Sequence, residues 1–143
     1  MTGVAATLLA NLAATLFLTG IGWSLQLVQL PLLFRGDYPE LVRQLALHRT
    51  LNSRLIALPM LVEFITAVWL VIEHPTSAVI AALVLWLPVG YATVWYSLLH
   101  RQIKKGYNRA IMERMKLWNL VRTLCWTARA GILLWTIAGQ MGI

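Results

Sequence analysis

The chain alternates between long apolar runs and short polar segments. Four apolar runs cover residues 5–34, 55–72, 76–99 and 117–141. An α-helix rises about 1.5 Å per residue, so about 20 apolar residues cross the hydrocarbon core of a bilayer. Each run is long enough for that crossing, and we therefore predict four membrane-spanning helices.

The segments between the runs predict the connections. Residues 35–54 and 100–116 are predicted loops, and residues 73–75 are predicted to form a very short turn. Within the first loop, Asp37 followed by Pro39 is typical of a helix start, and leucines alternate with charged residues after it. This amphipathic stretch either lies on the membrane surface or extends the second helix inward.

Composition and connection length together predict the fold class. Hydrophobic residues make up 59% of the 143 residues and charged residues only 12%, whereas about a quarter of a soluble domain is charged. Short connections favour antiparallel neighbours. We predict an all-α fold, an integral membrane up-down four-helix bundle, with a single transmembrane domain over residues 1–143.

The basic residues are distributed unevenly along the chain. Of the 12 Lys and Arg residues, four lie in 35–54, six in 100–116 and two in 117–141. Loops rich in Lys and Arg stay on the cytoplasmic side of bacterial membranes. We therefore predict a multi-pass protein of the bacterial inner (cytoplasmic) membrane, with both basic loops in the cytoplasm and both termini outside. Because anionic lipid accounts for the net charge of +7, membrane lipid is an expected partner and nucleic acid is not.

Polar residues of each predicted helix recur at helical spacing, so they share one face. Polar side chains in hydrocarbon turn toward the bundle interior, where they find partners. The stripes therefore predict a polar seam inside the bundle. Their members are Asn11, Thr15, Thr19, Gly22, Gln26 and Gln29; His48, Asn52, Pro59, Glu63 and Thr66; Thr93, Tyr96 and His100; and Asn119, Arg122, Trp126 and Arg129.

Three charged residues lie deep within the apolar runs. Glu63 belongs to the second run, and Arg122 and Arg129 belong to the fourth. Counted at about 1.5 Å per residue from the basic loops, Glu63 lies at a depth between the two arginines. An unpaired charge at that depth would cost several kcal/mol. We predict a structural ion pair of Glu63 with Arg122, Arg129 or both. Either it only fixes helix register or it belongs to a site.

Ionisable and amide groups converge near the cytoplasmic end of the predicted seam. The candidate catalytic residues are His48, His100, Glu63 and Arg122, and the candidate substrate-binding residues are Trp23, Gln26, Asn52, Tyr96, Asn119 and Trp126. The alternative for each histidine is a solvated or helix-capping side chain.

The cofactor remains open. No metal ligands are assigned, because His48 and Glu63 lie roughly 22 Å apart along one straight helix. Two histidines on facing helices are nevertheless able to ligate haem.

Several of these residues also carry a family resemblance. The residues that carry the resemblance are Trp23, Gln26, Pro31, Phe34, Tyr38, Pro39, His48, Pro59, Met60, Glu63, Trp69, His100, Asn119, Arg122, Thr123, Trp126, Thr127 and Arg129. In this pattern the chain resembles small bacterial four-span membrane proteins similar to the anthrone-oxygenase-like family. The resemblance implies a four-helix membrane fold and oxidation of a lipophilic aromatic or quinol-like substrate. The best-matched positions are Gln26, His48, Glu63, His100, Asn119 and Arg122. A weaker similarity is to small haem-dependent membrane protoporphyrinogen oxidases, whose His and Lys placement the chain lacks.

The leading functional hypothesis is a small membrane oxidoreductase or oxygenase acting on a lipophilic small molecule near the cytoplasmic leaflet. In it, His48 or His100 is the base, Arg122 supported by Asn119 stabilises an oxyanion, and Glu63 holds Arg122 in place and relays protons. Trp23, Tyr96 and Trp126 flank the aromatic ring. Three alternatives stay open: a proton-coupled carrier of lipophilic compounds that uses Glu63, a haem- or metal-binding protein, and a structural membrane subunit. A second copy of the chain is a further partner that the sequence leaves open.

Overall fold

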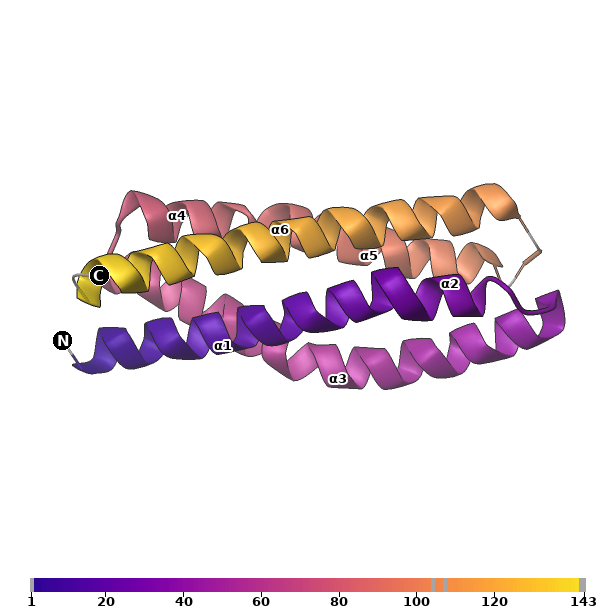
Figure 1. Cartoon of the computed structure of the whole chain (residues 1–143), viewed down its shortest axis with the longest axis horizontal. Coiled ribbons are helices and arrows are strands. Elements are labelled where there is room, and N and C mark those ends of the chain that lie inside the picture. The colour runs from indigo at the N-terminus through magenta and orange to yellow at the C-terminus, as the bar shows by residue number, and fades with distance from the viewer. Residues whose placement is uncertain (1, 104, 107, 142–143) are drawn as a thin grey trace.

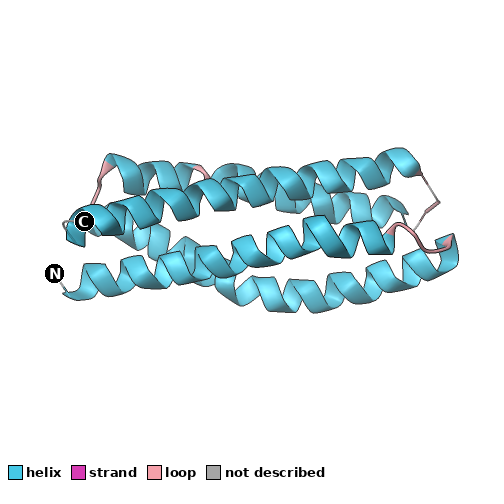
Figure 2. Ribbon diagram, in the orientation of Figure 1, coloured by secondary structure: helices cyan, strands magenta, loops and turns pink. Residues whose placement is uncertain are grey.

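A computed structural model describes residues 2–103, 105–106 and 108–141, and all regular elements in these residues are helices (Figure 2). The helices form four long rods that lie side by side (Figure 1). The rods consist of α1 (Thr2–Ser24), the π-helical turn η1 (Leu25–Gln29) and α2 (Leu30–Leu33); α3 (Tyr38–Glu73); α4 (Ser77–Val84) and α5 (Trp86–Ile103); and α6 (Arg109–Met141).

The order of the rods is up-down. Both ends of the chain and the α3–α4 turn lie at one end of the molecule, and the α2–α3 and α5–α6 connections lie at the other (Figure 1). The first rod packs against α3 and α6, and α6 packs against α4 and α5. Three rods, spanning Gly3–Leu33, Tyr38–Glu73 and Ser77–Ile103, are long and apolar enough to cross a membrane.

The connections at the basic end are shorter than the sequence suggested. Residues 38–54 of the predicted loop are helical and belong to α3, so of the two alternatives for this stretch the structure has the inward extension of the second helix. Pro39 lies in the first turn, where its missing N–H is tolerated, and Leu41 and Leu45 are buried. Helix α5 likewise continues to Ile103, and α6 already begins at Arg109.

Prolines explain two irregularities in the rods. Pro31 is the second residue after the π-helical turn. A proline ring clashes with the carbonyl four residues earlier, which here lies inside that turn, and this favours the wider turn. Pro88 lacks the N–H that would bond to Val84, and the third rod is interrupted at Leu85. Helix α3, in contrast, runs through Pro59 without interruption.

The exterior of the bundle is largely apolar, and polar and charged side chains are buried among the apolar residues of the core. Buried polar and charged residues are Asn11, Thr15, Glu63, His100, Asn119, Arg122, Thr123 and Arg129. Exposed large hydrophobic residues lie on all four rods and include Leu9, Leu27, Leu58, Ile72, Leu87, Val94, Leu124 and Trp135. Hydrocarbon surroundings favour an apolar exterior and the burial of polar side chains against one another.

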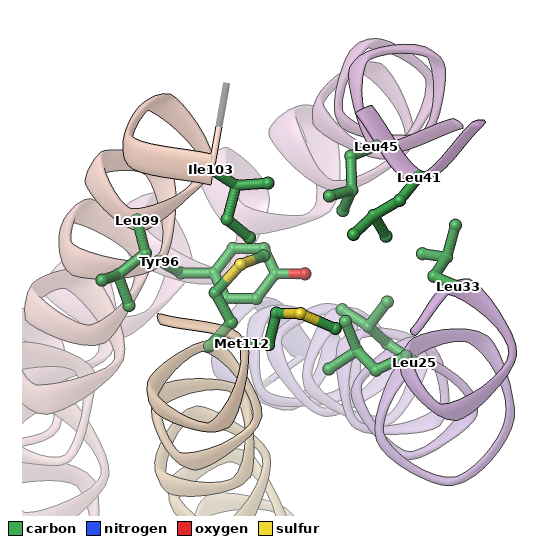
Figure 3. Packing of buried hydrophobic residues seen from close by; sticks show 10 residues of the cluster. Leu25, Leu33, Leu41, Leu45, Tyr96, Leu99, Ile103 and Met112 are labelled. Carbon is green, nitrogen blue, oxygen red and sulfur yellow. The ribbon is translucent and has the colours of Figure 1, made fainter. Parts of the chain in front are cut away.

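An apolar cluster closes the bundle at the end that carries the basic connections. It consists of Leu25, Leu30, Leu33, Leu41, Leu45, Tyr96, Leu99, Ile103, Met112 and Met115. Figure 3 shows these side chains meeting from all four rods. Tyr96 is the polar member of this cluster, and it connects the apolar end to the site described below.

A close approach fixes the first rod against α6. A Cβ atom on Gly22 would lie 2.6 Å from Thr123 Oγ1, so only glycine fits at this contact. Such small residues allow two helices to approach closely without a large apolar side chain between them. On α6, this contact lies directly next to Arg122 in the chain.

Candidate functional site

Buried polar side chains form two separate groups along the interior. The first, the Glu63 cluster, consists of Asn11, Thr15, Glu63, Thr66, Trp126 and Arg129. The second lies around Arg122, nearer the end that carries the basic connections. The sequence predicted one continuous seam, and the structure divides its charged residues between these two places.

The carboxylate of Glu63 is engaged on both oxygens. Its Oε1 accepts a hydrogen bond from Thr15 Oγ1 at 2.8 Å and lies 3.2 Å from Arg129 Nε. Its Oε2 accepts a hydrogen bond from Trp126 Nε1 at 3.2 Å. Glu63 and Arg129 are both 0% exposed. Among the described residues, then, Glu63 pairs with Arg129, and Arg122 is not one of its partners.

Two further contacts extend the Glu63 cluster to all four rods. Arg129 Nη1 donates a hydrogen bond to the carbonyl oxygen of Ala82 in α4. Asn11 Nδ2 donates to the carbonyl oxygen of Glu63 and to Thr66 Oγ1, each at 2.7 Å. Because α1, α3, α4 and α6 all contribute, the cluster holds the rods in one register.

Arg122 is a buried cation that pairs with no carboxylate of the described residues. It is 3% exposed, and no ion pair in the described part of the chain includes it. Its Nη2 donates a hydrogen bond to Asn119 Oδ1 at 2.8 Å. Its guanidinium carbon lies 5.3 Å from the ring centroid of Tyr96 and 5.1 Å from that of Trp126. An amide and two aromatic faces therefore stabilise this cation, and its charge is not neutralised by these contacts.

Asn119, which accepts the hydrogen bond from Arg122, is itself held by Gln26. Asn119 Nδ2 donates to Gln26 Oε1 at 2.8 Å and to the carbonyl oxygen of Gly22 at 3.3 Å. The sequence suggested that Asn119 and Gln26 contact the substrate. The structure instead gives them a contact between α6 and the first rod, which orients the Arg122 guanidinium.

A cavity of about 280 Å³ opens beside Arg122. Its walls come from η1, α3, α5 and α6, and both candidate histidines belong to it. The lining residues are Leu25, His48, Arg49, Asn52, Ser53, Ile56, Ala57, Met60, Thr93, Tyr96, Ser97, His100 and Arg122. The structure thus brings His48, Asn52, Tyr96, His100 and Arg122 together around one space.

The two histidines occupy different surroundings in the cavity. His48 Nε2 contacts Gln29 Oε1, and Asn52 Nδ2 lies 3.0 Å from His48 Nε2 and 3.3 Å from Nδ1. His100 is 4% exposed, and its ring centroid lies 4.9 Å from that of Tyr96. Since Arg122 contacts the same Tyr96 ring, His100 and Arg122 lie against one shared aromatic side chain.

The hydroxyl of Tyr96 is a buried polar atom with no hydrogen-bond partner among the described residues. Figure 3 shows this hydroxyl pointing from α5 toward the bundle interior, among the apolar side chains of the cluster. Leaving such a group unsatisfied costs about 1–3 kcal/mol. A polar atom of a bound molecule is able to remove that cost, because Tyr96 also lines the cavity.

Besides Gln26 and Asn119, three predicted site residues lie outside the cavity lining. Trp23 Nε1 donates a hydrogen bond to Thr127 Oγ1 at 3.1 Å, between α1 and α6. Trp126 is 0% exposed and lies between the two groups, with its indole N–H on Glu63 and its ring under Arg122. Glu63 itself belongs to the other cluster.

Sequence reasoning also missed several lining residues. Ser97 was not named, although it lies four residues after Thr93 and three before His100. Helical spacing would have been enough to add it to that stripe. Arg49 directly follows His48, and nothing in its position along the sequence distinguished it from the other arginines of the basic segments. The lining role of apolar residues such as Met60 has no signal in a sequence that is apolar throughout.

Among the described residues, no three His, Cys, Asp or Glu side chains lie close enough together to hold a metal ion. No family model, curated protein or solved structure matches the chain. The resemblance to anthrone-oxygenase-like proteins stays a prediction, since a likeness of fold does not establish function.

Proposed function

We propose that the chain crosses a bacterial cytoplasmic membrane four times, with both termini outside and the basic connections inside. Three rods have the length and apolarity of a span. The fourth, α6, carries Arg122 and Arg129, but both are buried against the other rods and its exposed large side chains from Leu117 onward are apolar. The Lys and Arg residues near the α2–α3 and α5–α6 connections support this orientation.

Cysteine labelling tests the orientation. In a Cys125→Ser background, Gly36→Cys reports the α2–α3 connection and Pro75→Cys reports the α3–α4 turn at the opposite end. A membrane-impermeant maleimide added to intact cells is expected to label Pro75→Cys and to label Gly36→Cys only after lysis. The reverse pattern, or equal labelling before lysis, contradicts the proposed orientation.

The cavity beside Arg122 is, in this proposal, the site of a lipophilic aromatic compound with an acidic C–H or O–H group. The burial of an un-neutralised arginine carries the proposal. Such a cation is stabilised further when an anion binds beside it, and the aromatic and apolar lining suits a ring system. The proposed activity is oxidation of this compound by molecular oxygen, as in the conversion of anthrone and O₂ to anthraquinone and water.

Each polar residue of the cavity receives a role in this reaction. His100 accepts the proton from the reacting carbon, and Arg122 stabilises the negative charge that develops on the ring oxygen. The carbanion reduces O₂ and, with the returned proton, becomes a hydroperoxide. Loss of water from the hydroperoxide leaves the carbonyl group, so one O₂ gives one carbonyl and one water. Asn119 acts as a positioning residue for Arg122.

Glu63 takes no part in this chemistry in our proposal. Both of its carboxylate oxygens are engaged by Thr15, Trp126 and Arg129. A carrier that moves protons on Glu63 would need to break these contacts in each cycle. The contacts favour a structural role for Glu63 over the carrier alternative.

Anthrone is a suitable probe for the proposed activity. The purified protein in mild detergent is expected to consume O₂ and to produce anthraquinone, measured by an oxygen electrode and by absorbance. Arg122→Gln is expected to lower kcat by about 100–1,000-fold, the usual effect of losing an oxyanion donor. His100→Gln is expected to lower kcat, because it removes the group that accepts the proton.

Matched controls separate these effects from misfolding. Arg114 is exposed on α6 and His74 is exposed after α3, so Arg114→Gln and His74→Gln should retain wild-type activity. Gel filtration and circular dichroism verify the fold of each variant. If folded wild-type protein neither binds nor oxidises anthrone and related phenols, or if Arg122→Gln matches Arg114→Gln, the proposal is wrong.

A further inference from the structure

A second hollow lies on the outer surface of the bundle, between the first rod and α3. It has a volume of about 360 Å³ and is lined by Leu16, Phe17, Gly20, Ile21, Ser24, Gln29, Asn52 and Leu55. We call it the α1–α3 groove. Its outer walls are apolar and exposed, with Leu16 45%, Phe17 47% and Leu55 50% exposed. In a membrane-spanning bundle these walls face lipid tails.

The π-helical turn η1 determines the inner end of the groove. Leu16, Gly20 and Ser24 follow one another at four-residue spacing, so they lie in one row along α1. A regular α-helix would place Val28 next in this row. Because the turn at Leu25–Gln29 is π-helical, the next position in the row is five residues on. Gln29 therefore follows Ser24, and its Nε2 donates a hydrogen bond to Ser24 Oγ at 3.2 Å.

Three polar side chains separate the groove from the cavity. Gln29 lines the groove and contacts His48, which lines the cavity. Asn52 lines both spaces and lies 3.0 Å from His48 Nε2. We call Gln29, His48 and Asn52 the polar partition. It consists of side chains alone, and side-chain rotamers exchange far faster than helices move.

We propose that the α1–α3 groove is an access site, through which the ligand of the cavity enters from the bilayer across the polar partition. The ligand class is a lipophilic aromatic compound with one polar end. Its ring lies against Leu16, Phe17 and Leu55, and its polar end meets Ser24, Gln29 and Asn52. The inference rests on the proposed function, because it assumes that the cavity takes a ligand dissolved in the membrane.

Blocking the groove tests this route without touching the cavity. Gly20 lines the groove, and a Cβ added there meets nothing within 4 Å, so Gly20→Phe is chosen to fill the groove. Gly131 on α6 is equally open and lies away from the groove, so Gly131→Phe is the matched control. Both variants are placed in lipid nanodiscs. Association of anthrone is followed without oxygen by stopped-flow quenching of tryptophan fluorescence.

The access site predicts a kinetic effect with no effect at equilibrium. Gly20→Phe should lower the association and dissociation rate constants of anthrone together, by tenfold or more, and leave Kd within twofold of wild type. Gly131→Phe should change neither. An association rate in Gly20→Phe equal to that in Gly131→Phe overturns the access site while the proposed function stands. A wild-type protein that binds no anthrone overturns both.

Discussion

Replacement of Glu63 by glutamine is the most direct test of how the bundle is held together. The change keeps the size of the side chain and one carbonyl acceptor, but it removes the charge opposite Arg129. Arg129 is 0% exposed, and its Nε lies 3.2 Å from Glu63 Oε1. Glu63→Gln therefore leaves a buried cation without its counterion.

The expected loss of stability follows from these contacts. Removing one partner of a buried ion pair costs about 3–5 kcal/mol. The introduced glutamine would still be able to accept the hydrogen bond from Thr15 or Trp126, so the lower end of that range applies. A loss of about 3 kcal/mol raises the unfolding equilibrium constant about 100-fold.

Equilibrium unfolding in mixed detergent micelles, followed by tryptophan fluorescence and circular dichroism, measures this loss. The double variant Glu63→Met with Arg129→Leu removes both charges, and replacing a buried pair by apolar residues is often neutral or stabilising. The double variant should therefore recover most of the lost stability. Glu40 and Arg43 form an exposed ion pair on α3, so Glu40→Gln is the control and should unfold like wild type.

Two results would refute the reasoning. One is a Glu63→Gln protein within about 1 kcal/mol of wild type, since a buried unpaired arginine should be far more costly. The other is a double variant whose loss of unfolding free energy equals the sum of the losses in Glu63→Met alone and Arg129→Leu alone. That result would mean that the two charges act independently.

Two further stability predictions follow from contacts of α6. Gly22→Ala places a Cβ atom 2.6 Å from Thr123 Oγ1 and should cost about 1–3 kcal/mol of unfolding free energy, whereas Gly20→Ala, in open space, should be neutral in the same micelle assay. Trp126→Phe keeps the ring under Arg122 but removes the 3.2 Å hydrogen bond to Glu63. It should cost about 1.5–3 kcal/mol, and a wild-type unfolding curve would show that this bond adds nothing.

Local properties of the chain were predictable from its sequence. The apolar runs, the helix start at Asp37–Pro39 and the polar stripes depend on residue type and on a fixed rise and rotation per residue. For that reason, the buried positions of Asn11, Glu63 and Arg129 were expected. The membrane orientation and the resemblance to anthrone-oxygenase-like proteins remain predictions.

The pairing of charges depended on tertiary structure. Arg122 and Arg129 are seven residues apart, about 10 Å along one face of a helix, so the sequence allowed either to meet Glu63. The axial offset between the rods decides between them. That offset depends on close contacts such as Gly22 against Thr123, which involve residues about 100 positions apart.

The cavity and its partition also arose only in three dimensions. The α-helical count placed Gln29 on the same stripe as Gln26, but the π-helical turn aligns it with Ser24 and against His48. Arg122 could then be left without a carboxylate because Arg129 already neutralises Glu63. Residue type and helical spacing alone indicated which polar side chains share the inward face of each helix. Packing of four helices decided which charge is paired and which faces an open cavity, because helix stagger and local widening depend on contacts distant in the chain.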